Sequence, residues 1–159
     1  MSRTIKLAAQ PSAEAFAPYG QFITRPMAHG QRQFYSDALP VAGLSPVLHT
    51  NSNPPAQLPA TIGKLERHPH AVQAFIPLDV ARYIVTVCPA LADGSPDLDR
   101  VLSFAMPGTQ GVIYARGVWH AGASVLDRDG SFAVLMWRGQ ANDDEIIEIS
   151  PLTLAGQDA

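Results

Sequence analysis

The residues of this chain that are best suited to acid–base or metal chemistry gather in one short stretch, residues 65–77. Eight consecutive positions there hold one acid, one guanidinium, two imidazoles and one carboxamide: Glu66, Arg67, His68, His70 and Gln73. Such a density of polar groups stands out in a chain of which only 16% is charged. The stretch could therefore hold a small anion, bind a metal ion or move a proton.

The spacing of the two histidines favours a shared set of ligands. Alternate side chains of an extended strand point to the same face, so His68 and His70 would lie side by side. Pro69 cannot donate to a sheet ladder, which predicts a strand end or an edge strand at this point. Gln73 begins the next strand, and His120 could supply a further imidazole. We expect a divalent metal, nickel or zinc, held by His68, His70, Gln73 and His120, and no organic cofactor. The alternative is that these are ordinary polar side chains without a metal.

A second polar stretch, residues 110–120, follows further along the chain. It contains a phenol, a guanidinium, an indole and an imidazole: Tyr114, Arg116, Trp119 and His120. A guanidinium is the natural bidentate partner of a carboxylate, so Arg67 and Arg116 are candidate anchors for an acidic substrate. The alternative is that either arginine only pairs with a nearby acid. Tyr114 and Trp119 are expected to line the wall of the pocket.

Short β-strands are predicted to position both stretches. The chain has 12 glycines and 14 prolines, which leave little room for long helices. Ser12 can cap a short helix over residues 13–17. Runs of β-branched and aromatic residues predict strands at 73–76, 82–88, 101–106, 111–114, 131–137 and 145–149. Residues 27–59, which are rich in Pro, Asn and Ser, predict loops and edge strands.

The order of these strands favours a closed β architecture. Turn pairs at Asp93–Gly94 and Asp129–Gly130 are typical of connections between antiparallel strands. The Gly-x-x-His pattern that ends at His120 is typical of the second motif of cupin barrels, and His-x-His followed by Gln73 is a degenerate form of the first. We therefore predict an all-β fold, mainly β with a short N-terminal helix, built as a cupin-like double-stranded β-helix barrel. Residues 1–159 are expected to form one such domain.

Composition argues against several classes of protein. A hydrophobic content of 47% is typical of a compact globular domain rather than a disordered chain. The net charge of −3 gives no electrostatic case for binding nucleic acid. No apolar run approaches the length of a signal peptide or a membrane span, and the single cysteine, Cys88, excludes an intramolecular disulfide. We expect a cytoplasmic protein without nucleic-acid or membrane partners.

Several motifs, in their order and register, resemble the ureidoglycolate lyase family. The matching stretches are Glu14–Phe16, Pro18–Gly20, Leu58–Pro59, Leu65–Pro69, Gln73–Pro77, Pro96–Leu98, Gln110–Val112 and Val118–His120. The resemblance implies a homodimeric cupin-type barrel that splits ureidoglycolate into glyoxylate and urea, in purine and allantoin degradation, by general acid–base elimination. It also implies which residues belong at the site: Glu66, His68, Gln73, Tyr114, Arg116 and His120.

The residues divide into two expected roles. The residues expected to be catalytic are Glu66, His68 and His120, and which of them is the base stays open. The residues expected to bind a small carboxylate substrate are Arg67, Gln73, Tyr114, Arg116 and Trp119. Two other functions stay open, a non-catalytic small-molecule binding barrel and a metal-dependent enzyme acting on another small carboxylate. The chain departs from the family pattern at several positions where the family usually carries a different, polar residue. The residues in this chain are Gln33, Tyr35, Ser52, Ala115, Ala121 and Trp137.

Overall fold

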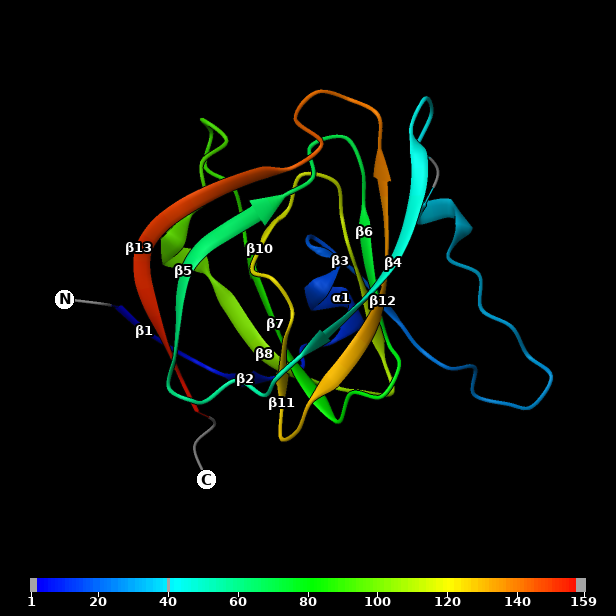
Figure 1. The fold of residues 1–159 in the computed structure, drawn as a ribbon, viewed down its shortest axis with the longest axis horizontal. Coiled ribbons are helices and arrows are strands. Elements are labelled where there is room, and N and C mark those ends of the chain that lie inside the picture. The colour runs from blue at the N-terminus through cyan, green and yellow to red at the C-terminus, as the bar shows by residue number, and fades with distance from the viewer. Residues whose placement is uncertain (1–2, 40, 157–159) are drawn as a thin grey trace.

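Two facing β-sheets make up most of the computed structural model, which describes residues 3–39 and 41–156 (Figure 1). The larger sheet has eight strands in the order β1-β13-β5-β10-β7-β8-β2, with β11 pairing beside this path with β7. Its strands are β1 (Arg3–Lys6), β2 (Ala8–Ala9), β5 (Ala60–Arg67), β7 (Arg82–Cys88), β8 (Leu102–Pro107), β10 (Trp119–His120), β11 (Ser124–Leu126) and β13 (Glu145–Ala155). The smaller sheet has five strands in the order β3-β9-β6-β12-β4. Its strands are β3 (Gly20–Ile23), β4 (Ser45–Asn53), β6 (Gln73–Pro77), β9 (Gly111–Tyr114) and β12 (Gly130–Arg138).

The main core lies between the two sheets. Each strand turns alternate side chains inward, and the inward set is rich in aromatic residues. Phe132 of β12 makes edge-to-face contacts with Phe75 of β6 at 5.7 Å and with Tyr83 of β7 at 5.1 Å between ring centroids. These three rings are almost fully buried. Their packing joins the two sheets through one apolar interior.

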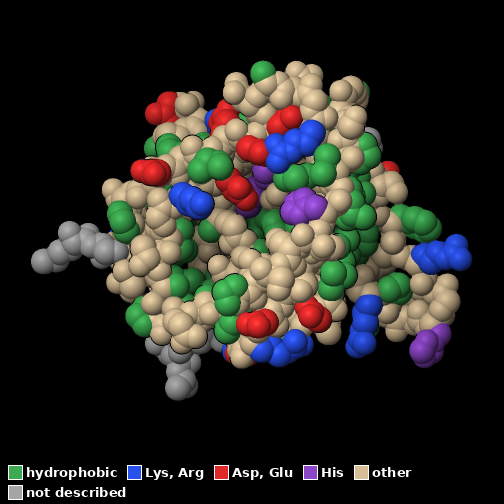
Figure 2. Space-filling view, viewed as in Figure 1, with side chains coloured by type: hydrophobic (Ala, Val, Ile, Leu, Met, Phe, Trp, Pro, Cys, Tyr) green, Lys and Arg blue, Asp and Glu red, His purple; other side chains and the backbone are tan. Residues whose placement is uncertain are grey.

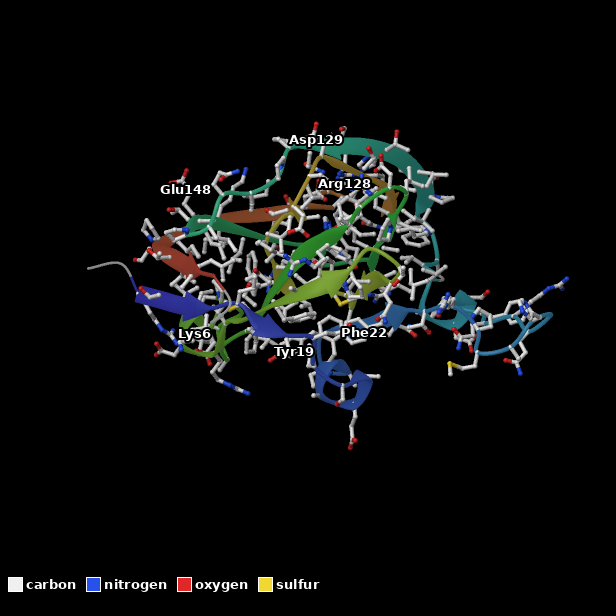
Figure 3. All side chains as sticks on the ribbon, turned by 90° about the horizontal axis from the view of Figure 1, so that it is seen from below. Lys6, Tyr19, Phe22, Arg128, Asp129 and Glu148 are labelled. Atoms are coloured by element: carbon white, nitrogen blue, oxygen red, sulfur yellow. The ribbon has the colours of Figure 1, made fainter. Side chains whose placement is uncertain are left out.

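A short helix covers one end of this interior. Helix α1 (Ala13–Phe16) begins where the Ser12 hydroxyl accepts a hydrogen bond from the Ala15 amide at 3.1 Å. Phe16 is fully buried and stacks on Phe22 of β3 with 4.5 Å between ring centroids. Figure 3 shows α1 at one end of the barrel, next to Tyr19 and Phe22. Two 3₁₀ turns, η1 (Ser36–Ala38) and η2 (Leu98–Arg100), complete the helical content of the described residues.

A second apolar layer covers the outer face of the larger sheet. Leu65 of β5, Cys88 of β7 and Trp119 of β10 pack there on one another. Strand β7 is consequently buried on both faces, as all but its first residue are buried. This arrangement explains why its sequence is a continuous apolar run rather than an alternating one.

The structure confirms the predicted fold class. It is mainly β with a short N-terminal helix, and its facing sheets, antiparallel except for the β1–β13 and β2–β8 pairs, form the expected cupin-like barrel. Strands β7 and β9 match the predicted ranges, whereas β13 extends six residues beyond the predicted end at residue 149. Within residues 27–59, β4 is a nine-residue edge strand that pairs along its whole length with β12. The preceding segment, described for residues 24–39 and 41–44, is mostly irregular and extends away from the barrel (Figure 1).

Candidate active site

Five polar side chains from both sheets meet inside the barrel, and we call them the inner cluster. They are Glu66, His68, Gln73, Tyr114 and His120. The larger sheet supplies Glu66 from β5 and His120 from β10, and His68 follows directly after β5. The smaller sheet supplies Gln73 from β6 and Tyr114 from β9. Figure 2 shows acidic and histidine side chains near the centre of this face, between the two sheets.

Strand pairing fixes the positions of these side chains. His120 lies directly opposite Glu66 in the antiparallel pairing of β10 with β5. Gln73 lies directly opposite Tyr114 in the pairing of β6 with β9. Directly opposed residues project from the same face of a sheet. Each sheet therefore presents one pair of polar side chains to the interior.

His120 is the most connected member of the inner cluster and is only 1% exposed. Its Nδ1 lies 2.9 Å from the carbonyl oxygen of Val118, which can only accept, so Nδ1 carries a hydrogen. Its Nε2 lies 3.0 Å from Oε1 of Gln73 and 3.4 Å from Oε1 of Glu66. The ring stacks on Tyr114 at 4.1 Å between centroids. Nε2 is thus the atom at which His120 can gain or lose a proton, and it lies beside the Glu66 carboxylate.

His68 presents an unpaired nitrogen to the interior. Its Nδ1 lies 2.8 Å from Oδ1 of Asp144, and because an ionised carboxylate only accepts, Nδ1 carries the hydrogen. Its Nε2 is buried and has no hydrogen-bond partner among the described residues. Leaving a buried polar atom unpaired costs about 1–3 kcal/mol, so its presence indicates a function. A neutral imidazole held in this way offers a lone pair for a proton or a metal ion.

The neighbouring groups keep Glu66 ionised, and burial keeps Tyr114 neutral. The hydrogen bond from His120, with further attraction from His120, His68 and Lys64, holds the pKa of Glu66 below its usual value although burial opposes this. Burial raises the pKa of Tyr114, and the charge of Glu66 raises it further. Tyr114 therefore keeps its proton at neutral pH and acts by stacking on His120 rather than by proton exchange.

Three members of the inner cluster have the chemistry of a metal site. Glu66, His68 and His120 each offer one ligand atom, and these atoms lie within 4.8 Å of one another. Two imidazoles and a carboxylate suit zinc, nickel or iron. The second nitrogen of each histidine is hydrogen-bonded, to Asp144 or to the carbonyl of Val118, as is usual for metal-binding histidines. The residues therefore fit a divalent metal.

This set differs from the ligand set expected from sequence. The set contains Glu66 and lacks His70, and Gln73 borders it, with Oε1 3.0 Å from Nε2 of His120. Strand β5 ends at Arg67, and residues 69 and 70 form a turn, so His68 and His70 do not share a strand face.

Asp144 is a site residue that the sequence analysis did not identify. It accepts from His68 through one carboxylate oxygen and pairs through the other with Arg138. The row of acids at residues 143–145, which leads into the strand predicted at 145–149, is the only sequence signal for it. Asp144 fixes the tautomer of His68, and Arg138 fixes Asp144.

Arg67 and Trp119 lie on the opposite face of the larger sheet from the inner cluster. Arg67 pairs through Nε with Glu145 at 2.6 Å and donates to the carbonyl of Gly94 at 3.0 Å. Its guanidinium lies 4.5 Å from the ring centroid of Trp119, whose indole donates to the same carbonyl at 2.9 Å. The structure does not bring this pair, expected to bind substrate, to the cluster.

Arg116 and His70 line another pocket. They share it with Val41, Leu44 and Gln140, and its volume is about 340 Å³. Arg116 follows β9 and is exposed, and it makes no ion pair with a described residue. The backbone joins the two regions, because the amide of Gly117 donates to the carbonyl of His68 at 3.0 Å. Arg116 is thus close in the chain to the inner cluster but does not contact it.

The departures from the family pattern are spread over the surface of the barrel. Ala121 packs on the outer layer with Trp119, and Ala115 lines a groove together with Arg116. Ser52 belongs to the edge strand β4, and Trp137 belongs to β12, which pairs with it. The Tyr35 hydroxyl accepts from the amide of Thr24 at 2.8 Å, and Gln33 hydrogen-bonds to the same tyrosine. These positions lie outside the inner cluster as defined above.

Comparison with known proteins shows one family. The family model described as ureidoglycolate lyase matches residues 4–154. The ureidoglycolate lyase of Burkholderia cepacia is 38% identical over 145 residues, which cover 84% of this chain and 80% of the relative. The ureidoglycolate lyase of Escherichia coli (strain K12 / DH10B) is 38% identical over 142 residues, covering 84% of this chain and 88% of the relative.

One solved structure is similar at a lower level. RmlC from Streptococcus suis, in complex with dTDP-D-xylose, superposes with a TM-score of 0.40 at 13% sequence identity. The superposition covers 81% of this chain and 54% of that chain.

Proposed function

The chain belongs to the ureidoglycolate lyase family, and we propose that it cleaves ureidoglycolate to glyoxylate and urea. The proposal is supported by 38% identity to curated relatives that carry this name and by the composition of the inner cluster. The single observation on which the chemistry depends is the unpaired, buried Nε2 of His68, which faces a cluster that also contains His120 and Glu66.

The reaction requires one proton to be removed and one to be delivered. Ureidoglycolate carries a hydroxyl, a carboxylate and a ureido nitrogen on the same carbon. Loss of the hydroxyl proton forms the carbonyl of glyoxylate as the carbon–nitrogen bond breaks, and the departing nitrogen takes up a proton to give urea. Atoms and charge then balance without water or an oxidant. The site therefore needs a base and an acid on either side of one carbon atom.

We assign the base to His68 and the acid to His120. Asp144 keeps the hydrogen of His68 on Nδ1, so the Nε2 lone pair is available to take the hydroxyl proton. His120, with Nδ1–H bound to a carbonyl, gives up its second proton from Nε2, which lies 3.4 Å from the ionised Glu66 carboxylate. The two rings are 5.4 Å apart between centroids, close enough for both to act on the substituents of one carbon atom of a substrate that binds beside them.

The other members of the inner cluster orient these two groups. Gln73 contacts Nε2 of His120 at 3.0 Å, and its amide can turn to accept from or donate to that atom in the two protonation states. Tyr114 fixes the plane of the ring by stacking. Glu66, His68 and His120 are also the residues that would hold a divalent metal, which when bound would polarise a substrate oxygen.

Release of urea and glyoxylate from ureidoglycolate by the purified protein tests this proposal. The assay is run after dialysis against a chelator and again after addition of nickel, zinc or manganese. Release at a catalytic rate in the chelated protein supports the two-histidine mechanism, and release only after addition of metal supports the metal-dependent form. No release in any condition would contradict the lyase assignment and favour a non-catalytic binding barrel.

We also propose that the protein is a homodimer, as the family resemblance implies. The outer face of the smaller sheet carries several apolar side chains: Leu48 of β4 lies opposite Leu135 of β12, and Ile76 of β6 lies opposite Ala133. Leu48 is 69% and Ile76 39% exposed, which is a large apolar area for a solvent-facing sheet. Leu48→Lys should yield monomers by light scattering, whereas Leu91→Lys, on a loop elsewhere, should not. A dimer unaffected by Leu48→Lys would contradict the choice of this face.

Further properties expected from sequence remain predictions. These are the cytoplasmic location and the absence of nucleic-acid and membrane partners. In the described part of the chain, no helix has the length and apolar character needed to cross a membrane.

A further inference from the structure

The proposed substrate is an acid, but the cations nearest the inner cluster are already engaged or face elsewhere. Arg67 binds Glu145 on the opposite face of the larger sheet. Arg138 pairs with Asp144, which holds His68. Arg116 belongs to the other pocket. A substrate carboxylate that enters beside the cluster must therefore find a different positive group.

Lys64 is placed to supply this charge. It lies two residues before Glu66 on β5, so both side chains project from the same face of the strand. The two residues line one pocket of about 140 Å³, together with Gly122 and Ile146. Lys64 is exposed and makes no ion pair with any residue of the described ranges.

We propose that Lys64 binds the carboxylate of the substrate in the pocket that it shares with Glu66, a proposal that rests on the proposed lyase function. Residues two apart on a strand are separated by roughly 6.6 Å, a span that the four-carbon stem of lysine covers easily. In ureidoglycolate the carboxylate is bonded directly to the carbon that carries the hydroxyl. Its binding by Lys64 places that carbon near Glu66 and the two histidines.

The charge environment agrees with this geometry. Lys64 and Glu66 bring opposite charges to the pocket that they share. The charge of Lys64 offsets the repulsion that the Glu66 carboxylate would exert on an incoming anion. Without Lys64, the negative charge of Glu66 in this pocket would repel an acidic substrate.

The competing interpretation is an ordinary cross-strand pair with Glu148. Lys64 and Glu148 are directly opposite in the pairing of β5 with β13, so their side chains project from the same face of the sheet. The described structure contains no ion pair between them. If Lys64 only served Glu148, its removal would change stability and leave substrate binding unaltered.

The test compares two variants, Lys64→Met and Lys64→Arg, with the control Lys6→Met. Lys6 of β1 is the only other lysine in the sequence, and its replacement by Met changes the net charge by the same amount as Lys64→Met. KM for ureidoglycolate should rise roughly 10- to 100-fold in Lys64→Met, the effect of losing one charge-assisted hydrogen bond, and should largely recover in Lys64→Arg. The inhibition constant of glyoxylate should rise in parallel. Inhibition by urea, which lacks a carboxylate, should not change.

Two outcomes separate this proposal from the lyase assignment. Equal KM and equal glyoxylate inhibition in the wild type and Lys64→Met, or a loss of thermal stability as the only effect, would overturn the role of Lys64. If the wild type released no urea, glyoxylate binding would be measured directly by calorimetry. Glyoxylate binding that is weakened by Lys64→Met, but not by Lys64→Arg or Lys6→Met, would support the carboxylate site, whereas the lyase assignment would be contradicted. Glyoxylate binding that is unaffected by Lys64→Met, or that is undetectable in the wild type, would overturn the proposed role of Lys64.

Discussion

Replacing Asp144 by asparagine tests how the structure prepares His68 as a base. In the wild type one carboxylate oxygen accepts from Nδ1 of His68 at 2.8 Å and the other accepts from Arg138. An amide has a single oxygen, and Arg138 can only donate, so that oxygen turns to Arg138 and the NH₂ group turns to His68. Nδ1 must then accept, which moves the hydrogen to Nε2. The lone pair that should take the substrate proton is lost.

The expected loss follows from the hydrogen bond that is changed. A hydrogen bond to a charged group contributes about 1.5–3 kcal/mol, and about 1.4 kcal/mol corresponds to tenfold in rate. Asp144 has 30% of its side chain exposed, so solvent screening favours the lower half of this range. We expect kcat for urea release to fall by roughly 10- to 30-fold, with a smaller change in KM.

Arg138→Met is the matched control for this substitution. It removes the guanidinium but keeps the carboxylate on His68, so kcat should stay within about threefold of the wild type. In the double variant the amide oxygen is free to turn back to His68, and activity should partly recover. A kcat for Asp144→Asn within twofold of the wild type, with an unchanged circular dichroism spectrum, would refute the assignment of Asp144 as the residue that positions His68.

Three further predictions concern other groups. His120→Ala should lower kcat by roughly 100-fold or more while the far-ultraviolet circular dichroism is retained, and retained turnover would remove His120 from the reaction. The hydrogen bond and charge of Arg82 hold the pKa of Asp127 below its usual 3.8, so the pair stabilises the fold above that pH and the contribution is lost as pH falls through the lowered value. The difference in Tm between the wild type and Asp127→Asn should therefore be small but present at pH 7 and vanish in strong acid; a difference independent of pH would contradict it. Burial, with a contribution from Asp97, raises the pKa of Cys88 to about 11, so a thiol reagent at pH 8 should modify it only after unfolding. Rapid labelling of the folded protein would contradict this.

The parts of the fold that were predictable from sequence are those with local causes. The cap of α1 needs only Ser12 and an amide three residues later. Strand β7 was evident from seven consecutive residues of high β-propensity, and Pro89 ends it. The full length of β13 was not predictable from the sequence, because its last residues form a parallel pair with β1 at the other end of the chain.

The site was predictable only as far as residue types and order allow. Glu66, His68, Gln73, Tyr114 and His120 are brought together, but the sequence could not show which face of each strand turns inward. A shift of one residue exchanges the two faces of a strand, which is why Arg67 and Trp119 lie outside while their neighbours Glu66 and His120 lie inside.

Two other site features depend on distant contacts. His70 is separated from His68 because β5 ends one residue before His68, and only the pairing with β13 and β10 determines where that end lies. Asp144 is 76 residues from His68 in the chain, and no spacing rule connects them. Lys64 became a candidate only when its pocket with Glu66 was known.

The most direct measurement of the central claim is the rate of urea and glyoxylate release from ureidoglycolate by the wild type and by His68→Ala, in the chelated state and with added metal. The account predicts stoichiometric release of both products by the wild type. It also predicts a loss of this release in His68→Ala, although the fold, measured by circular dichroism, is retained. Turnover that is unaffected by the loss of His68, or no turnover by the wild type in any condition, would contradict it.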